Sequence, residues 1–287
     1  MEFESRILSR FVYTTGEWKL VKILTGLLWL LTIARVTLVN KYAGQPFPEG
    51  ICRLFNCAAL IQTPIVYVLL LLAVLLVILY ITERYMPVTL TGLALISIIV
   101  LTVERSHGIS SRDELWSLLF IAQAIAYIRY SFTNTNFKQQ IAVQNLAMFY
   151  SIQLIAAVYV TSGLTKLQTS GIQWIMDGPN IAAALYKINA QMHIEFGLSQ
   201  THSYLNSVMR FINNYPNITR TFFTLAILTE LFALTMLLSR KWARKYGFLL
   251  LGLHIGIFVC TVIFIPVFIF CVVVYLIGLP KRLTSKL

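Results

Sequence analysis

Eight apolar stretches with almost no charged residues constrain this chain more than any other feature of its sequence. Several are about 18 residues or longer, the length at which a helix can cross the roughly 30 Å hydrocarbon core of a bilayer. Charged residues make up only 12% of the chain, whereas soluble domains carry about 25%. The mean hydropathy of +0.76 points the same way. The sequence therefore predicts an all-α polytopic membrane protein in contact with a lipid bilayer.

The expected fold is a bundle of about eight transmembrane helices, forming a single membrane domain over residues 1–287. Residues 1–18 are polar and predict an amphipathic arm along the membrane. The final apolar stretch is too long for one crossing, and Pro266 breaks it because proline lacks an amide hydrogen. One long kinked helix is the alternative. The predicted spans cover residues 20–39, 64–81, 88–103, 115–129, 142–165, 221–238, 246–264 and 266–280.

The net charge of +12 is interpreted as a signal of topology, and nucleic acid is excluded as a partner. Basic residues gather in short loops and at the end of the chain, which is typical of cytoplasmic segments. With eight spans, both termini and these basic loops fall on the cytoplasmic side. The segment 166–220 then forms a large extracytoplasmic loop with helical patterns. The basic residues that set this orientation are Arg84, Arg129, Lys138, Arg240, Lys241, Arg244, Lys245, Lys281, Arg282 and Lys286.

Two of the four cysteines, Cys52 and Cys57, lie in the first extracytoplasmic loop of this topology. An oxidising outer compartment favours a disulfide between them. We interpret it as a structural clip, with a redox or client-exchange pair as the alternative. No tight cluster of cysteine and histidine ligands is present in the sequence, so no metal site is predicted.

Lys166 is the first candidate for chemistry, because it stands where the fifth apolar stretch ends and the longest polar loop begins. A lysine partly removed from water can act as a base. Tyr159, Ser162 and Gly163 share its face at helical spacing. His107 lies at the membrane boundary on the same predicted side and can exchange protons near neutral pH. The alternative for Lys166 is that its amine only extends to the membrane surface.

Glu230 and His254 lie inside the sixth and seventh predicted spans at similar depth. Ionisable residues inside a bilayer are costly and usually mark functional sites. A proton relay or a cofactor contact is one interpretation, and a neutral hydrogen-bonded pair that fixes helix packing is the other. Lys22 is expected to extend to the interface, while Gln123, Gln144 and Gln153 are expected to bond between helices.

The segment from Tyr159 to Gly178 reads Tyr-x3-Gly-x2-Lys-Leu, followed by Trp174 and Gly178. It resembles the central motif of the horizontally transferred transmembrane (HTTM) family. That family includes the membrane part of vitamin K-dependent gamma-carboxylase and the sporulation-delaying-protein B group, which helps mature an exported toxic peptide. Glu230, and His254 followed by Pro266, resemble the later helices of the family.

The resemblance implies a function at the outer face of a bacterial cytoplasmic membrane, in the maturation or modification of an exported peptide. Lys166 matches the catalytic base of the carboxylase, and His107 stands near the position of an important histidine. A quinone or a reduced vitamin K-like lipid is the implied cofactor, with Tyr159, Gly163 and Trp174 near it. The carboxylase has a long extramembranous region that this chain lacks. A non-catalytic scaffold, client-binding or immunity protein, assisted by a soluble partner, remains the alternative to an enzyme.

Overall fold

The computed structural model describes residues 9–41, 50–54, 63–106, 114–131, 137–187, 203–261 and 266–278, and within them every regular element is helical. Helical residues occur in each of the eight predicted apolar stretches, and residues 262–264 and 279–280 at the ends of the last two lie outside the described residues. Four helices are long and apolar enough to cross a membrane, so the chain has the character of an integral membrane protein. These four are Thr15–Leu38, Met86–Ser106, Ile141–Ser170 and Pro216–Leu237.

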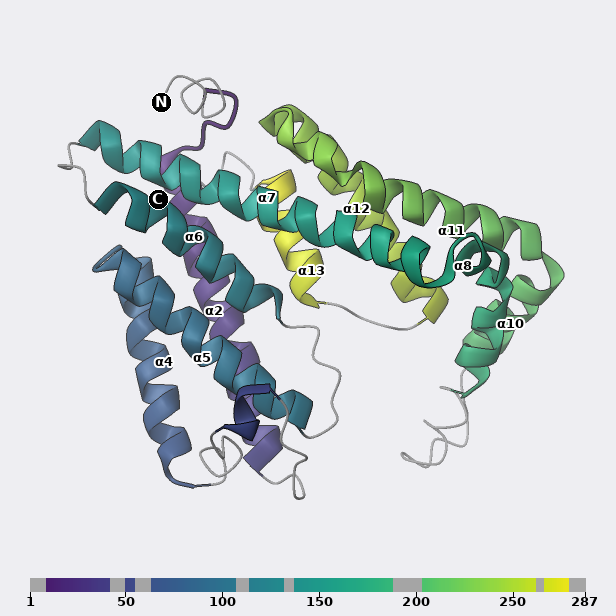
Figure 1. Ribbon diagram of the computed structural model, residues 1–287, viewed down its shortest axis with the longest axis horizontal. Coiled ribbons are helices and arrows are strands. Elements are labelled where there is room, and N and C mark those ends of the chain that lie inside the picture. The colour runs from purple at the N-terminus through teal and green to yellow at the C-terminus, as the bar shows by residue number, and fades with distance from the viewer. Residues whose placement is uncertain are drawn as a thin grey trace. The chain divides into compact units, whose positions relative to one another are not determined.

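The helices group into two compact units, shown with their connections in Figure 1. Unit 1 comprises Met1–Leu154 and Val273–Leu287, and unit 2 comprises Ile155–Val272. The helix α7 (Phe137–Ser170) contributes its first part to unit 1 and its second part to unit 2.

Unit 1 is built from four further apolar helices that lie side by side (Figure 1). Its α5 packs against α2, α4 and α6, and the short turn η1 packs against α5. Buried tryptophan and phenylalanine rings fill the space between helices, as in the edge-to-face pair of Trp29 and Phe120. The elements are α2 (Thr15–Lys41), η1 (Gly50–Arg53), α4 (Ile65–Ile81), α5 (Met86–Ser106), α6 (Leu115–Ser131) and the π-helical turn η4 (Val272–Ile277).

The start of α2 differs from the predicted arm. The Thr14 hydroxyl accepts a hydrogen bond from the amide of Glu17, and the Glu17 carboxylate accepts one from the amide of Thr14. This reciprocal capping box begins the helix at Thr15, earlier than expected. Just before it, the Tyr13 amide donates to the side chain of Asn145, so this part of the arm is fixed to α7.

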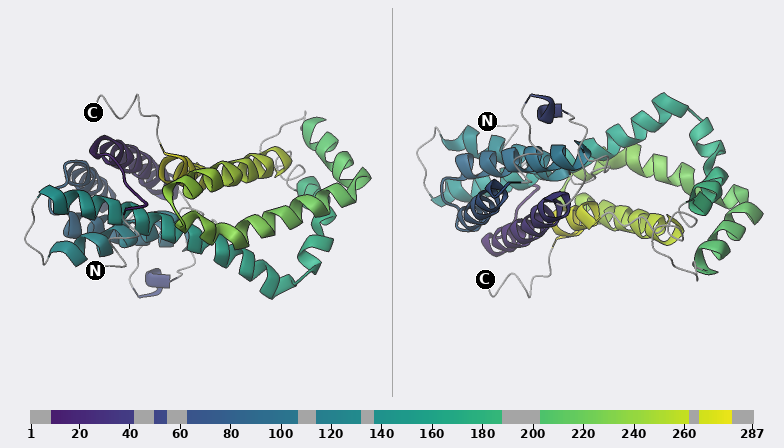
Figure 2. Two further views of the ribbon diagram at one scale, coloured as in Figure 1. Left: turned by 90° about the horizontal axis from the view of Figure 1, so that it is seen from above. Right: turned by 90° about the horizontal axis from the view of Figure 1, so that it is seen from below.

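Unit 2 contains α11 and α12 beside each other, with α10 in contact with both (Figure 2). Helix α11 begins at Pro216, whose missing amide hydrogen is not needed in a first turn. Helix α7 ends where Gly171 adopts a φ of 56° and its amide bonds to the carbonyl of Leu167. The elements are α8 (Gln173–Met176), η2 (Gly178–Asn180), α10 (Ser203–Asn214), α11 (Pro216–Leu231), η3 (Phe232–Leu237), α12 (Arg240–Thr261) and α13 (Pro266–Cys271).

Candidate functional site

Lys166, in the last turns of α7, forms an ion pair with Glu230 of α11. Its amine Nζ lies 2.5 Å and 2.6 Å from the two carboxylate oxygens. The Ser162 hydroxyl, one turn earlier on α7, donates to the same carboxylate at 3.4 Å. The Glu230 side chain is 8% exposed and that of Lys166 is 28% exposed. The negative charge of Glu230 is therefore balanced by Lys166 inside unit 2, while the Lys166 side chain remains partly exposed.

Gly163 allows α7 and α11 to approach closely enough for this ion pair. A Cβ atom at this position would lie 3.1 Å from Cβ of Glu230 and 3.2 Å from Cδ2 of Leu231. Those distances are shorter than ordinary carbon contacts. The glycine in the motif thus has a packing role next to the lysine.

Two aromatic rings, those of Trp174 and Phe223, lie next to the Lys166 amine. Nζ lies 5.0 Å from the ring centroid of Trp174, within cation–π range. The Trp174 ring packs on Phe223 at 4.6 Å between centroids. Phe223 in turn rests on Gly178, where an added Cβ would lie 3.3 Å from the ring. Trp174 and Gly178, both parts of the predicted motif, therefore build one wall around the amine.

Lys166, Glu230 and Trp174 form the polar end of an apolar cavity of about 320 Å³ within unit 2. Ligand pockets for small molecules begin near this size and combine apolar walls with a few polar groups. The amine and carboxylate could exchange a proton with a hydroxyl group of a ligand whose remainder is apolar. The apolar walls come mainly from α10, α11 and α12, and include Phe211, Ile212, Phe222, Ala226, Leu253 and Ile257.

Tyr159 and His254 form a separate buried pair. The Tyr159 hydroxyl lies 2.5 Å from Nε2 of His254. The ring of Phe268 packs on both, with centroid distances of 6.0 Å and 5.9 Å. This contact joins α7 to α12.

A pairing of Glu230 with His254, suggested by their similar depth, is wrong. Each is buried and bonded, but to α7: Glu230 to Lys166, and His254 to Tyr159. Depth along two neighbouring helices does not reveal which face each side chain occupies. The predicted cofactor residues thus separate into two groups. Gly163, Trp174 and Glu230 gather around the predicted catalytic Lys166, while Tyr159 and His254 form a second pair.

Two further predicted site residues, His107 and Cys57, lie outside the described residues. Cys52 is described, and its thiol is buried against Val66 and Val103. The catalytic role of His107 and the disulfide stay predictions. Within the described ranges, no group of three or more histidine, cysteine or acidic side chains is suited to a metal ion.

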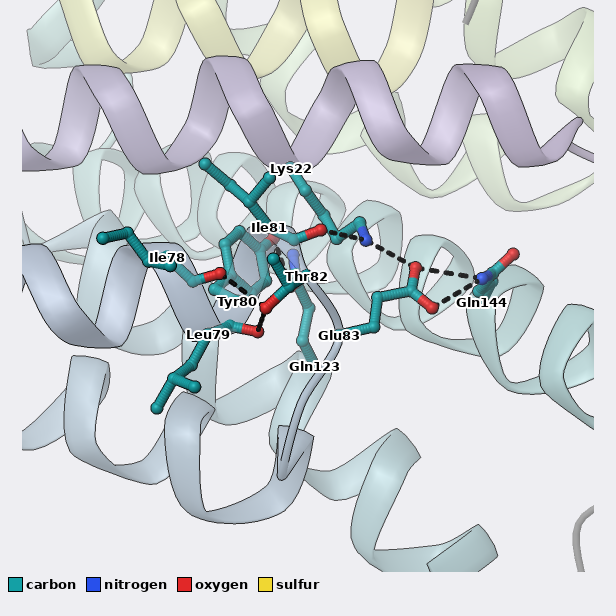
Figure 3. A network of polar contacts seen from close by, with 9 residues as sticks. All are labelled: Lys22, Ile78, Leu79, Tyr80, Ile81, Thr82, Glu83, Gln123 and Gln144. Carbon is teal, nitrogen blue, oxygen red and sulfur yellow. Dashed lines mark hydrogen bonds and ion pairs between the residues drawn. The ribbon is translucent and has the colours of Figure 1, made fainter.

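Sequence reasoning missed a buried polar network in unit 1, drawn in Figure 3. The amine of Lys22 donates to the carbonyl of Ile81 at 3.1 Å and to the Glu83 carboxylate at 2.5 Å. The Gln144 amide donates to both oxygens of that carboxylate, at 3.0 Å and 3.2 Å (Figure 3). The Lys22 side chain is only 2% exposed, so its amine is paired inside unit 1 and does not reach solvent.

A second layer of polar side chains lies next to this network. Gln123 accepts from the Tyr80 hydroxyl at 2.9 Å and donates to Tyr275 at 3.1 Å. Bonding between helices by Gln123 is thereby confirmed. Gln144 of α7 bonds instead to Glu83 in the turn between α4 and α5, and Gln153 is exposed. A lysine inside an apolar span was the available signal. Its acceptors lie at the end of α4 and in the turn that follows, and hydropathy does not identify them.

Comparison of the chain with known proteins gave no match to a family model, to a curated protein or to a solved structure.

Proposed function

We propose that the chain is an eight-span protein of the bacterial cytoplasmic membrane, similar to the HTTM family, that acts at the outer face on an exported peptide. Its termini would lie in the cytoplasm. The observation that carries the proposal is the Lys166–Glu230 ion pair at the polar end of an apolar cavity. A charge pair is costly to bury, so its position beside an apolar cavity calls for a ligand or client.

The cavity supports an amphiphilic ligand with a flat, polar head, such as a quinol or its oxidised quinone. The rings of Trp174 and Phe223 would lie along the head, and its hydroxyl would meet the amine of Lys166. Transfer of the amine proton to Glu230 would leave a neutral base. That base would then remove the hydroxyl proton of the ligand.

The experiment that tests the catalytic role of Lys166 compares exported peptides from two cell lines. One line makes the unsubstituted chain and the other makes the Lys166→Met variant. Mass spectrometry should find a modified or processed peptide only with the unsubstituted chain, at equal protein level in the membrane. Lys187→Met is the matched control, because Lys187 is an exposed lysine of the same unit. Unchanged peptides with Lys166→Met would rule out a catalytic role.

A second candidate function is that of a scaffold, which binds a client without a chemical reaction. The Lys166–Glu230 ion pair favours this function. Both oxygens of Glu230 hold the Lys166 amine, so the amine is not free to act as a base in this state. In a scaffold, the pair would only hold α7 to α11.

An exchange of the two charges separates the candidates. The double variant Lys166→Glu with Glu230→Lys keeps an ion pair between the helices but moves the amine to α11. A scaffold should retain most of its function in this variant, as measured by peptide output. An enzyme should lose its product, since a base displaced by even 1 Å can lower a rate by about a hundredfold.

A further inference from the structure

A second, polar cavity lies at the surface of unit 2, between α10 and the segment formed by η2 and residues 181–187. Its volume is about 580 Å³, within the range of ligand-binding sites. We call it the amide groove, because three of its polar lining residues are asparagines. The lining includes Asn180, Ala183, Tyr186, Asn206, Arg210 and Asn213.

Helix α10 separates the amide groove from the apolar cavity beside Lys166. Val208, Phe211 and Ile212 of this helix line the apolar cavity. Its opposite side supplies Asn206, Arg210 and Asn213 to the groove.

The wall of the groove is held in place by packing. Leu205, Met209 and Ile212 of α10 form a buried cluster with Ala182 and Leu185. The amide groove is therefore a surface supported by its own small core.

The spacing of the polar groups on α10 matches an extended peptide. Residues 206, 210 and 213 lie on one face, and at 1.5 Å per residue their positions along the helix axis differ from the first by about 6 Å and about 10.5 Å. An extended chain advances about 3.3 Å per residue, so these separations correspond to roughly two and three residues. Carboxamides both donate and accept hydrogen bonds, as peptide groups require.

The charge of the lining selects the kind of peptide. Among the lining residues, all of them described, Arg210 is the charged one. The nearby carboxylate of Asp177 does not line the groove and already accepts from Gln173 and Asn180. Arginine pairs with carboxylates in a planar, charge-assisted geometry.

We propose that the amide groove binds an extended peptide segment that carries an acidic side chain. A lipid headgroup would satisfy Arg210 but would leave the carboxamides without peptide groups to bond. The inference extends the proposed function, because the segment would be the polar part of the exported client. It does not depend on Lys166 being a base.

The test measures binding of a short fluorescein-labelled peptide of alternating serine and glutamate to the purified chain in detergent, by fluorescence polarisation. The same peptide with glutamine in place of glutamate should bind at least tenfold more weakly. Arg210→Gln should weaken binding of the acidic peptide by about the same factor. Arg84→Gln, at an exposed arginine of unit 1, should leave the affinity unchanged.

A charge reversal keeps the test decisive if the loss of Arg210 only disturbs folding. Arg210→Glu should bind a serine–lysine peptide better than the acidic one, an exchange that unfolding cannot produce. Equal affinity of the unsubstituted chain for acidic and neutral peptides would overturn the proposal. So would displacement of the acidic peptide by vesicles of phosphatidylglycerol but not of phosphatidylcholine. Lys166→Met should bind the acidic peptide normally, so failure here and failure of the proposed chemistry remain distinguishable.

Discussion

At the scale of single residues, Gly163 should be the least replaceable glycine near the candidate site. An alanine there would press its Cβ against Glu230 and Leu231, and overpacking of this kind costs about 1–3 kcal/mol. We expect Gly163→Ala to lower the midpoint of thermal unfolding in detergent and to weaken the Lys166–Glu230 pair.

Gly252 of α12 is the matched control, since nothing lies within 4 Å of a Cβ added there. Gly252→Ala should stabilise its helix by about 0.5–1 kcal/mol. Equal thermal midpoints for both alanine variants would contradict the role assigned to Gly163.

Helical spacing was enough to predict that Ser162, Gly163 and Lys166 share a face, because contacts within one helix follow from its period. Spacing could not identify Glu230 as the partner. That contact joins residues 64 positions apart, and it depends on how α7 and α11 cross. The same limit explains the wrong pairing of Glu230 with His254.

At the scale of elements, the turn between α4 and α5 should be a critical junction of unit 1. Glu83 has a φ of 58° and Tyr85 a φ of 50°, a region that costs non-glycine residues roughly 1–2 kcal/mol each. Lys22 of α2 and Gln144 of α7 hold the Glu83 carboxylate in this conformation. The contacts of two helices, α2 and α7, therefore converge on one strained turn.

We expect Lys22→Met to destabilise unit 1 by about 3–5 kcal/mol, because it leaves a partly buried carboxylate without its cation. Lys19→Met, at an exposed position on the same helix, should change little. Adding Glu83→Gln to Lys22→Met should recover part of the loss in a thermal unfolding series. No difference between the two single variants would show that the network contributes nothing to stability.

Hydropathy predicted the helices because membrane length and apolar character set them directly, but their ends follow different rules. The capping box of Thr14 and Glu17 starts α2 early. The change from α11 to the tighter turn η3 at Phe232 leaves no hydropathy signal. Local hydrogen bonds decide such boundaries, and average hydropathy does not contain them.

At the scale of the whole molecule, the proposed eight-span topology predicts which loops face the cytoplasm. In a background without the four native cysteines, a cysteine at Lys241 should resist a membrane-impermeant maleimide in intact cells and react after lysis. A cysteine at Lys187 should react in intact cells. Labelling of both positions from the same side would contradict the topology. The proposed extracytoplasmic location of Lys166 would then be wrong.

The central claim is that the cavity beside Lys166 binds the flat head of an amphiphile. The most direct measurement is quenching of tryptophan fluorescence by decylubiquinone in the detergent-solubilised chain. Trp174 is one of five tryptophans and stands at the polar end of the cavity. We predict a saturable quenching component that disappears in Trp174→Phe and is shifted to at least tenfold higher concentration by Ala226→Leu, which fills the cavity. Quenching that rises linearly and equally in all three chains would mean that the quinone only dissolves in the micelle, and would contradict the account.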